Sequence, residues 1–156
     1  MQIENIKLQD ETMQIIEFVS IVKERGEMDS SQKAMDAIQS TLLTLSERMF
    51  GYEAQNLAQQ LPEEVRMFLR LSEERQPFSL QEFYRRVALR EAVDMDKAVF
   101  HAQAVMAAVE DAVPEEEVNN LRAQFPDEYD EIFAPEHENG KQPPPREEGE
   151  QAENGS

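Results

Sequence analysis

Apolar residues recur along the chain at steps of three and four, which is the spacing of one face of an α-helix. Two long stripes follow this rule. The first is Ala34, Ala37, Ile38, Thr41, Leu42, Leu45 and Met49, and the second is Ala98, His101, Ala102, Val105, Met106, Val109 and Val113. Glycine is scarce, and no run of β-branched residues alternates with polar ones. The pattern predicts an all-α fold.

The stripes and their flanking residues predict eight helices. Gly26 is expected to close the first helix in the left-handed conformation, and Gly51 to close the second. Asp29 and Gln32 resemble a capping box before the second helix. The expected helices cover residues 12–25, 30–50, 52–60, 62–71, 79–91, 95–113, 114–125 and 127–133.

The two stripes belong to a unit that occurs twice. A shift of 64 residues aligns identical residues, among them Lys33/Lys97, Gln39/Gln103, Glu53/Glu117, Asn56/Asn120, Leu57/Leu121, Gln60/Gln124 and Pro62/Pro126. Upstream the shift becomes 65 and aligns Phe18/Phe83, Val22/Val87 and Arg25/Arg90. A sustained offset indicates duplication. We predict two tandem pseudo-equivalent four-helix repeats packed as one bundle, with repeat 1 at 12–71, a linker at 72–78 and repeat 2 at 79–133.

Both ends of the chain differ from this body. Residues 1–11 carry isolated apolar residues among polar ones, and we expect a flexible segment there. Residues 134–156 contain no large apolar side chain and are rich in glutamate and proline. Such a segment buries too little surface to offset the entropy of ordering, so the pattern predicts a disordered acidic tail.

Composition narrows the possible partners and chemistry. The net charge of -18 and pI of about 4.4 repel phosphate backbones and anionic membranes, so neither nucleic acid nor membrane is an expected partner. The same field attracts basic proteins. The absence of cysteine excludes disulfides and thiolate sites. Because the sequence shows no signal-like start and no apolar run of about 20 residues, we expect a cytoplasmic protein.

A motif written twice identifies a related family. It runs F-x-x-x-V-x-x-R, then an alanine-led helix, then E-A-x-x-L-x-x-Q-L-P. Its residues are Phe18, Val22, Arg25, Glu53, Ala54, Leu57, Gln60, Leu61 and Pro62, and again Phe83, Val87, Arg90, Glu117, Val118, Leu121, Gln124, Phe125 and Pro126. The chain resembles the bacterial "domain of unknown function 2267" family over residues 13–133. The resemblance implies a small helical bacterial protein and no established activity, cofactor or catalytic residue.

Two pairs of amides are candidates for a binding site. Asn56 and Gln60 are four residues apart, as are Asn120 and Gln124, so each pair shares one helix face. They would line a pseudo-symmetric ligand groove, or else satisfy free backbone groups where the helices end. The second interpretation is favoured.

His101 is the single histidine of the helical body and stands where the first repeat has Ala37. A general base needs an orienting partner and a substrate cleft, and the sequence shows neither, so a structural histidine at a helix-packing edge is favoured. The acidic residues between 110 and 131 carry hard oxygen ligands, yet no EF-hand spacing or Glu-x-x-His pair accompanies them. We therefore predict no metal or cofactor site.

Positive charge is concentrated in Arg66, Arg70, Arg85, Arg86 and Arg90. These side chains would form a docking patch or pair with nearby acidic residues, and pairing is favoured. The suggested acidic partners are Glu73, Glu74 and Glu82. The short expected helices offer no basic residue except Arg122, which argues against helix-turn-helix DNA binding.

Two functional hypotheses follow from these observations. In the first, the protein is a non-catalytic interaction or adaptor module that presents an acidic surface to a basic protein partner. In the second, it is a small-molecule or metal-binding helical domain with a pocket at the repeat interface around His101, Asn56 and Asn120.

Overall fold

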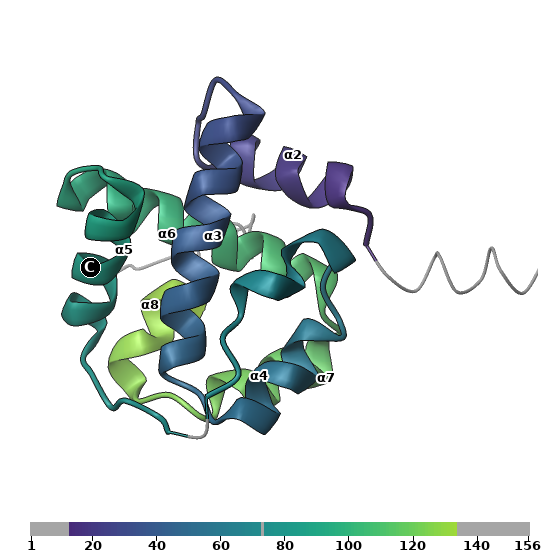
Figure 1. Ribbon diagram of the computed structural model, residues 1–156, viewed down its shortest axis with the longest axis vertical. Helices are drawn as coiled ribbons and strands as arrows, with labels where there is room; N and C mark the ends of the chain where they lie inside the picture. Colours follow the sequence, from purple (N-terminus) through teal and green to yellow (C-terminus); the bar gives the residue numbers. More distant parts are fainter. Residues whose placement is uncertain (1–12, 73, 134–156) are drawn as a thin grey trace, which may run out of the picture.

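The computed structural model describes residues 13–72 and 74–133, and every regular element in those ranges is helical (Figure 1). The all-α prediction is confirmed. The flexible segment 1–11 and the acidic tail 134–156 lie outside the described residues. The elements are α2 (Ile15–Arg25), α3 (Ser31–Glu47), α4 (Gly51–Ala58), η1 (Glu63–Phe68), α5 (Leu80–Glu91), α6 (Met95–Ala112), α7 (Glu115–Arg122), η2 (Asp127–Tyr129) and α8 (Asp130–Phe133).

The long helices begin at capping side chains. The Ser30 hydroxyl accepts a hydrogen bond from the backbone N–H of Lys33 at 3.1 Å, and the Asp94 carboxylate accepts one from that of Lys97 at 2.9 Å. These bonds satisfy amide groups that have no partner within the helix. The expected capping box of Asp29 and Gln32 is wrong, because the Gln32 amide instead donates to Asp36 Oδ1 at 3.0 Å.

Gly26 closes α2 as expected but is not in the left-handed conformation, and Gly51 does not close α3. Gly26 has φ −90°, and the positive φ falls on the next residue, Glu27, at 53°. Gly51 opens α4 instead of closing α3. A Cβ at Gly51 would lie 2.8 Å from the carbonyl oxygen of Ser72, so this position needs glycine because another backbone segment approaches it closely.

The expected α-helix over 62–71 is a 3₁₀ segment of six residues. Beyond it Leu69 is extended, and the backbone N–H of Arg70 donates to the Ser46 hydroxyl at 2.9 Å. That bond ties the chain to the end of α3. The last expected helix is likewise divided, into η2 and α8.

The two long helices α3 and α6 form the centre of the fold, and α2 and α5 cover them (Figure 1). α2 packs mainly on α6, and α5 packs on both α3 and α6. Ile38, Leu42 and Leu45 of α3 are at most 1% exposed, as the stripe predicts. The opposing face of α6 is mostly alanine and valine, which lets neighbouring helices approach closely. Within 13–72 and 74–133, no helix has the length and apolar character needed to cross a membrane.

Candidate functional site

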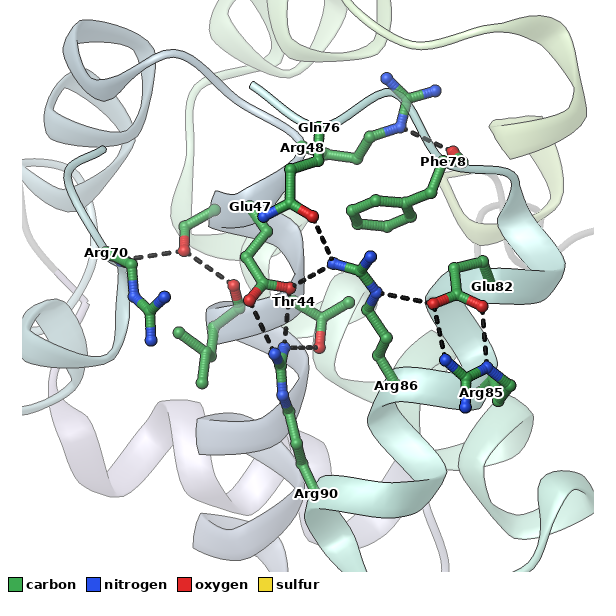
Figure 2. A network of polar contacts seen from close by, with 12 residues as sticks. Thr44, Glu47, Arg48, Arg70, Gln76, Phe78, Glu82, Arg85, Arg86 and Arg90 are labelled. Atoms are coloured by element: carbon green, nitrogen blue, oxygen red, sulfur yellow. Dashed lines mark hydrogen bonds and ion pairs between the residues drawn. The ribbon is translucent and has the colours of Figure 1, made fainter. Parts of the chain in front are cut away.

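The arginines of α5 meet a buried carboxylate at the end of α3 (Figure 2). Glu47, whose side chain is 6% exposed, accepts hydrogen bonds from Arg90 at 2.6 and 2.9 Å and from Arg86 at 2.9 Å. Arg86 also pairs with Glu82, at 2.9 Å, and Glu82 pairs in turn with Arg85 at 2.8 Å. The three arginines are therefore engaged within the molecule, as internal pairing requires.

Glu47 itself was missed by sequence reasoning. Glu47 lies in the last turn of α3, where the negative end of the helix dipole disfavours a carboxylate. This unfavourable position is the one local signal in the sequence that positive side chains lie nearby. Burial by itself would raise the pKa of Glu47, but the hydrogen bonds and charges of Arg90 and Arg86 outweigh burial and hold it below its ordinary value. The carboxylate is thus charged at neutral pH.

Arg48, the residue after Glu47, joins the linker to η2. Arg48 is 6% exposed, and its Nε donates to the carbonyl oxygen of Phe78 at 2.9 Å and to the Tyr129 hydroxyl at 3.2 Å. The Tyr129 hydroxyl in turn donates to the same carbonyl at 2.7 Å. Of the remaining candidates, Arg66 donates to the carbonyl oxygen of Leu61 at 3.0 Å. Most of the basic cluster therefore has structural contacts.

The four candidate amides come together between α4 and α7, which lie side by side in Figure 1. They line a cavity of about 280 Å³ that we call the amide cavity. Its walls are pairs of residues at the offset of 64, together with Tyr52. The pairs are Met49/Val113, Glu53/Glu117, Asn56/Asn120, Leu57/Leu121 and Gln60/Gln124.

The polar groups of the amide cavity are largely unpaired. With its nitrogen turned inward, the Gln124 amide donates to both carboxylate oxygens of Glu53 at 3.2 Å. Across the described ranges, the side chains of Asn56, Gln60 and Asn120 have no hydrogen-bond partner. The interpretation that these amides satisfy backbone groups at helix ends is therefore not supported.

The two carboxylates of the amide cavity differ in their surroundings. Glu53 Oε1 accepts a hydrogen bond from the backbone N–H of Phe50 at 2.9 Å. The equivalent position before Glu117 is Pro114, which has no N–H to donate. Glu117 is exposed and has no ion-pair partner in the described part of the chain. One carboxylate has a local structural role, and the other is available to a ligand.

His101 lines a different cavity, of about 390 Å³, which we call the histidine cavity. The structure therefore does not bring His101 together with Asn56 and Asn120. It does supply what the sequence could not show: Glu91 Oε2 lies 2.5 Å from His101 Nδ1, and both residues line a cleft. The other lining residues are Glu27, Met28, Asp29, Lys33, Asp36, Ala92, Val93 and Lys97.

Burial dominates the electrostatics of this pair. It raises the pKa of Glu91, and the neighbouring Asp36 adds to the rise, against the lowering effect of His101. The side chains of Glu91 and His101 are only 4% and 13% exposed. A carboxylate that holds Nδ1 fixes the orientation of an imidazole ring and leaves Nε2 for other partners.

Most acidic residues between 110 and 131 lie at the surface. We call the acidic face the exposed residues Glu115, Glu116, Glu117, Asp127, Glu128, Asp130 and Glu131. Glu131 accepts a hydrogen bond from the Tyr84 hydroxyl at 2.8 Å, and burial is the main cause of a raised pKa of Tyr84. Among the described residues, no group of three or more histidine, aspartate or glutamate side chains is arranged to hold a metal ion.

Comparison with known proteins gives one finding. A family model described as "Uncharacterized conserved protein (DUF2267)" matches residues 16–132. No curated protein matches the chain.

Proposed function

The chain belongs to the DUF2267 family of uncharacterised proteins, and we propose that it is a non-catalytic interaction module that binds a basic protein partner. The acidic face supports this proposal, because none of its residues forms an ion pair within the described ranges. Meanwhile three arginines that would have offset this charge contact Glu47 and Glu82. The electrostatic potential at the surface of α7 and α8 is therefore negative and favours cationic partners.

The amide cavity is the observation that carries the proposal. Two carboxylates, Glu53 and Glu117, line it from opposite helices, and no lysine or arginine does. Unpaired amide oxygens stand beside them. A guanidinium or ammonium group presents only donors and a positive charge, so it complements this lining. Tyr52, with 66% of its surface exposed, offers an aromatic ring at the same place for a cation to cover.

The proposal includes the two-repeat arrangement. If the chain is two pseudo-equivalent four-helix repeats, α4 and α7 are counterparts, and the paired lining of the amide cavity follows from their meeting across a pseudo-twofold axis. The packing of α2 on α6 and of α5 on α3 supports this relation. The glutamates of residues 134–156 would add to the attraction for a basic partner, and the bacterial cytoplasm remains the location that we predict.

The test measures binding of a fluorescent arginine-rich peptide to the full-length protein by anisotropy. Glu117→Lys reverses one charge in the amide cavity at an exposed residue with no structural contact. Glu24→Lys changes the net charge by the same amount on α2, at the opposite end of the molecule in Figure 1, and is the matched control. We expect Glu117→Lys to weaken binding about tenfold or more, a loss of about 1.4 kcal/mol.

Salt supplies the second readout. Exposed charges more than about 8 Å apart are screened at physiological ionic strength, so binding by wild-type protein should weaken steadily as salt is added. If Glu117→Lys and Glu24→Lys lose the same affinity, the effect comes from net charge alone, and the amide cavity is not the binding site. Binding that is insensitive to salt would refute the electrostatic module itself.

A further inference from the structure

The histidine cavity contains a buried carboxylate oxygen that has no partner. Glu91 Oε2 contacts His101 Nδ1, but Glu91 Oε1 has no hydrogen-bond partner among the described residues. The side chain is 96% buried, so bulk water does not compensate this atom. Native structures satisfy nearly all such groups, because an unpaired buried acceptor is destabilising. Glu91 is one of the residues that line the histidine cavity, so a donor from a bound molecule reaches this carboxylate once the side chain turns toward the cavity.

Backbone strain is concentrated around the same cavity. Glu27 has φ 53° and Ala92 has φ 63°, and within the described ranges these are the non-glycine residues with positive φ. Both line the histidine cavity. Left-handed conformations disfavour residues with a Cβ atom and persist where the surrounding structure enforces them, often at ligand sites. Ala92 is the C-cap of α5 and Glu27 follows Gly26, the C-cap of α2, so the cavity lies where the ends of these two helices meet.

Charge of both signs lines the cavity in separate places. The side chains of Glu91 and His101 are largely buried, whereas Lys33 and Lys97 are exposed. Lys33 contacts Asp29 at 3.4 Å. Lys97 has no ion-pair partner in the described part of the chain. On α6, Lys97 and His101 are four residues apart and so lie on one helix face, about one turn from each other.

We propose that the histidine cavity binds a small zwitterion of the amino-acid class, with its ammonium group toward the Glu91 carboxylate and its carboxylate toward Lys97. His101 Nε2, which has no partner among the described residues, is a second acceptor for the ammonium group when the neutral ring carries its proton on Nδ1 and donates it to Glu91. A simple anion is disfavoured by the Glu91 carboxylate. An amine without a carboxylate leaves Lys97 unpaired. This site is separate from the amide cavity and does not depend on a basic partner.

The test follows the ring nitrogens of His101 by NMR while ligands are added to the ¹⁵N-labelled full-length protein. The chain has only two histidines, and His137→Gln assigns the signals. The probes are glycine, β-alanine and γ-aminobutyrate, with propylamine and propionate as single-charge controls. Calorimetry gives the affinities. We expect at least one zwitterion to shift the His101 signals, with no shift from either control at the same concentration.

Variants assign the contacts. Glu91→Gln and Lys97→Ala should each lower the affinity about tenfold to a hundredfold, the range that a hydrogen bond to a charged group supplies. Glu24→Gln, an exposed carboxylate on α2 outside the cavity, is the control and should bind like the wild type. Melting curves establish that each variant folds. The proposal is overturned if no zwitterion shifts His101, if propylamine or propionate shifts it equally, or if both cavity variants bind like the wild type.

Discussion

Replacing Glu47 by glutamine measures what the buried carboxylate contributes to stability. Glutamine has nearly the same shape and keeps one acceptor oxygen, so the change removes charge without opening a cavity. Wild-type Glu47 accepts three charge-assisted bonds from Arg86 and Arg90, the shortest at 2.6 Å (Figure 2). Removing one partner of a fully buried ion pair costs about 3–5 kcal/mol. The two arginine side chains are 22% and 30% exposed, so solvent screening reduces the expected loss to about 2–3 kcal/mol.

The loss should depend on pH in a defined direction. Burial acts to raise the pKa of Glu47, and hydrogen bonds and charges from Arg90 and Arg86 lower it further than burial raises it, to a value below the ordinary 4.5. A lowered folded-state pKa means that the stabilisation is fully present above pH 4.5 and disappears as the pH falls through the folded-state value. Wild type and Glu47→Gln should therefore differ at neutral pH and converge in acid.

Urea unfolding followed by circular dichroism, repeated at several pH values, measures both the loss of stability and its dependence on pH. The midpoint should fall in Glu47→Gln while the slope with urea stays constant, because the same surface is exposed on unfolding. Glu82→Gln is the control: hydrogen bonds from Arg85 and then Arg86 lower the pKa of Glu82 to about 2, but its side chain is 28% exposed. Its loss should be smaller. Equal stability of Glu47→Gln and wild type at pH 7, or a difference that persists in strong acid, would refute the reasoning.

Two further substitutions test the core. Leu45→Ala should destabilise by about 2–5 kcal/mol, because Leu45 is 1% exposed, whereas Leu89→Ala at 66% exposure should change stability by less than about 0.5 kcal/mol. A melting temperature unaffected by Leu45→Ala would contradict the packing of α3. Thr41→Val should stabilise by about 1 kcal/mol, because Thr41 Oγ1 is buried without a hydrogen-bond partner and valine has the same shape. Calorimetric melting checks the sign, and a loss of stability would mean that the hydroxyl is satisfied.

The sequence predicted those parts of the fold that depend on neighbouring residues. The helices expected over 79–91 and 95–113 begin within a residue of those bounds, because the side chains of Ser79 and Asp94 each reach an amide three residues away. The apolar stripes placed Leu42 and Leu45 inside because helix periodicity alone decides which face is buried. Where a side chain from a distant segment intervenes, as the Ser46 hydroxyl does at the backbone N–H of Arg70, the local prediction of an α-helix was wrong.

The candidate sites depend on distant pairs, and local patterns do not contain that information. Glu47 lies 39 and 43 residues from Arg86 and Arg90, so no spacing rule connects them. The internal repeat did predict that the amides correspond, and the structure shows where they meet. The repeat could not predict that His101 lies in another cavity. Its partner Glu91 comes from a neighbouring helix, and the first half has no glutamate at the position equivalent to Glu91.

The packing of α2 on α6 and of α5 on α3 has a consequence for how this chain folds. α2 packs mainly on α6 of the other half, and α5 packs on both α3 and α6, so a half synthesised alone would leave part of its apolar surface exposed to water. We therefore expect the fold to be completed only after both halves have been made, and unfolding to occur as one cooperative transition. If the chain arose by duplication of one unit, as we propose, a single unit would have left the same surface exposed unless a second copy covered it, and fusion of two copies would have converted an assembly that depends on concentration into one that does not.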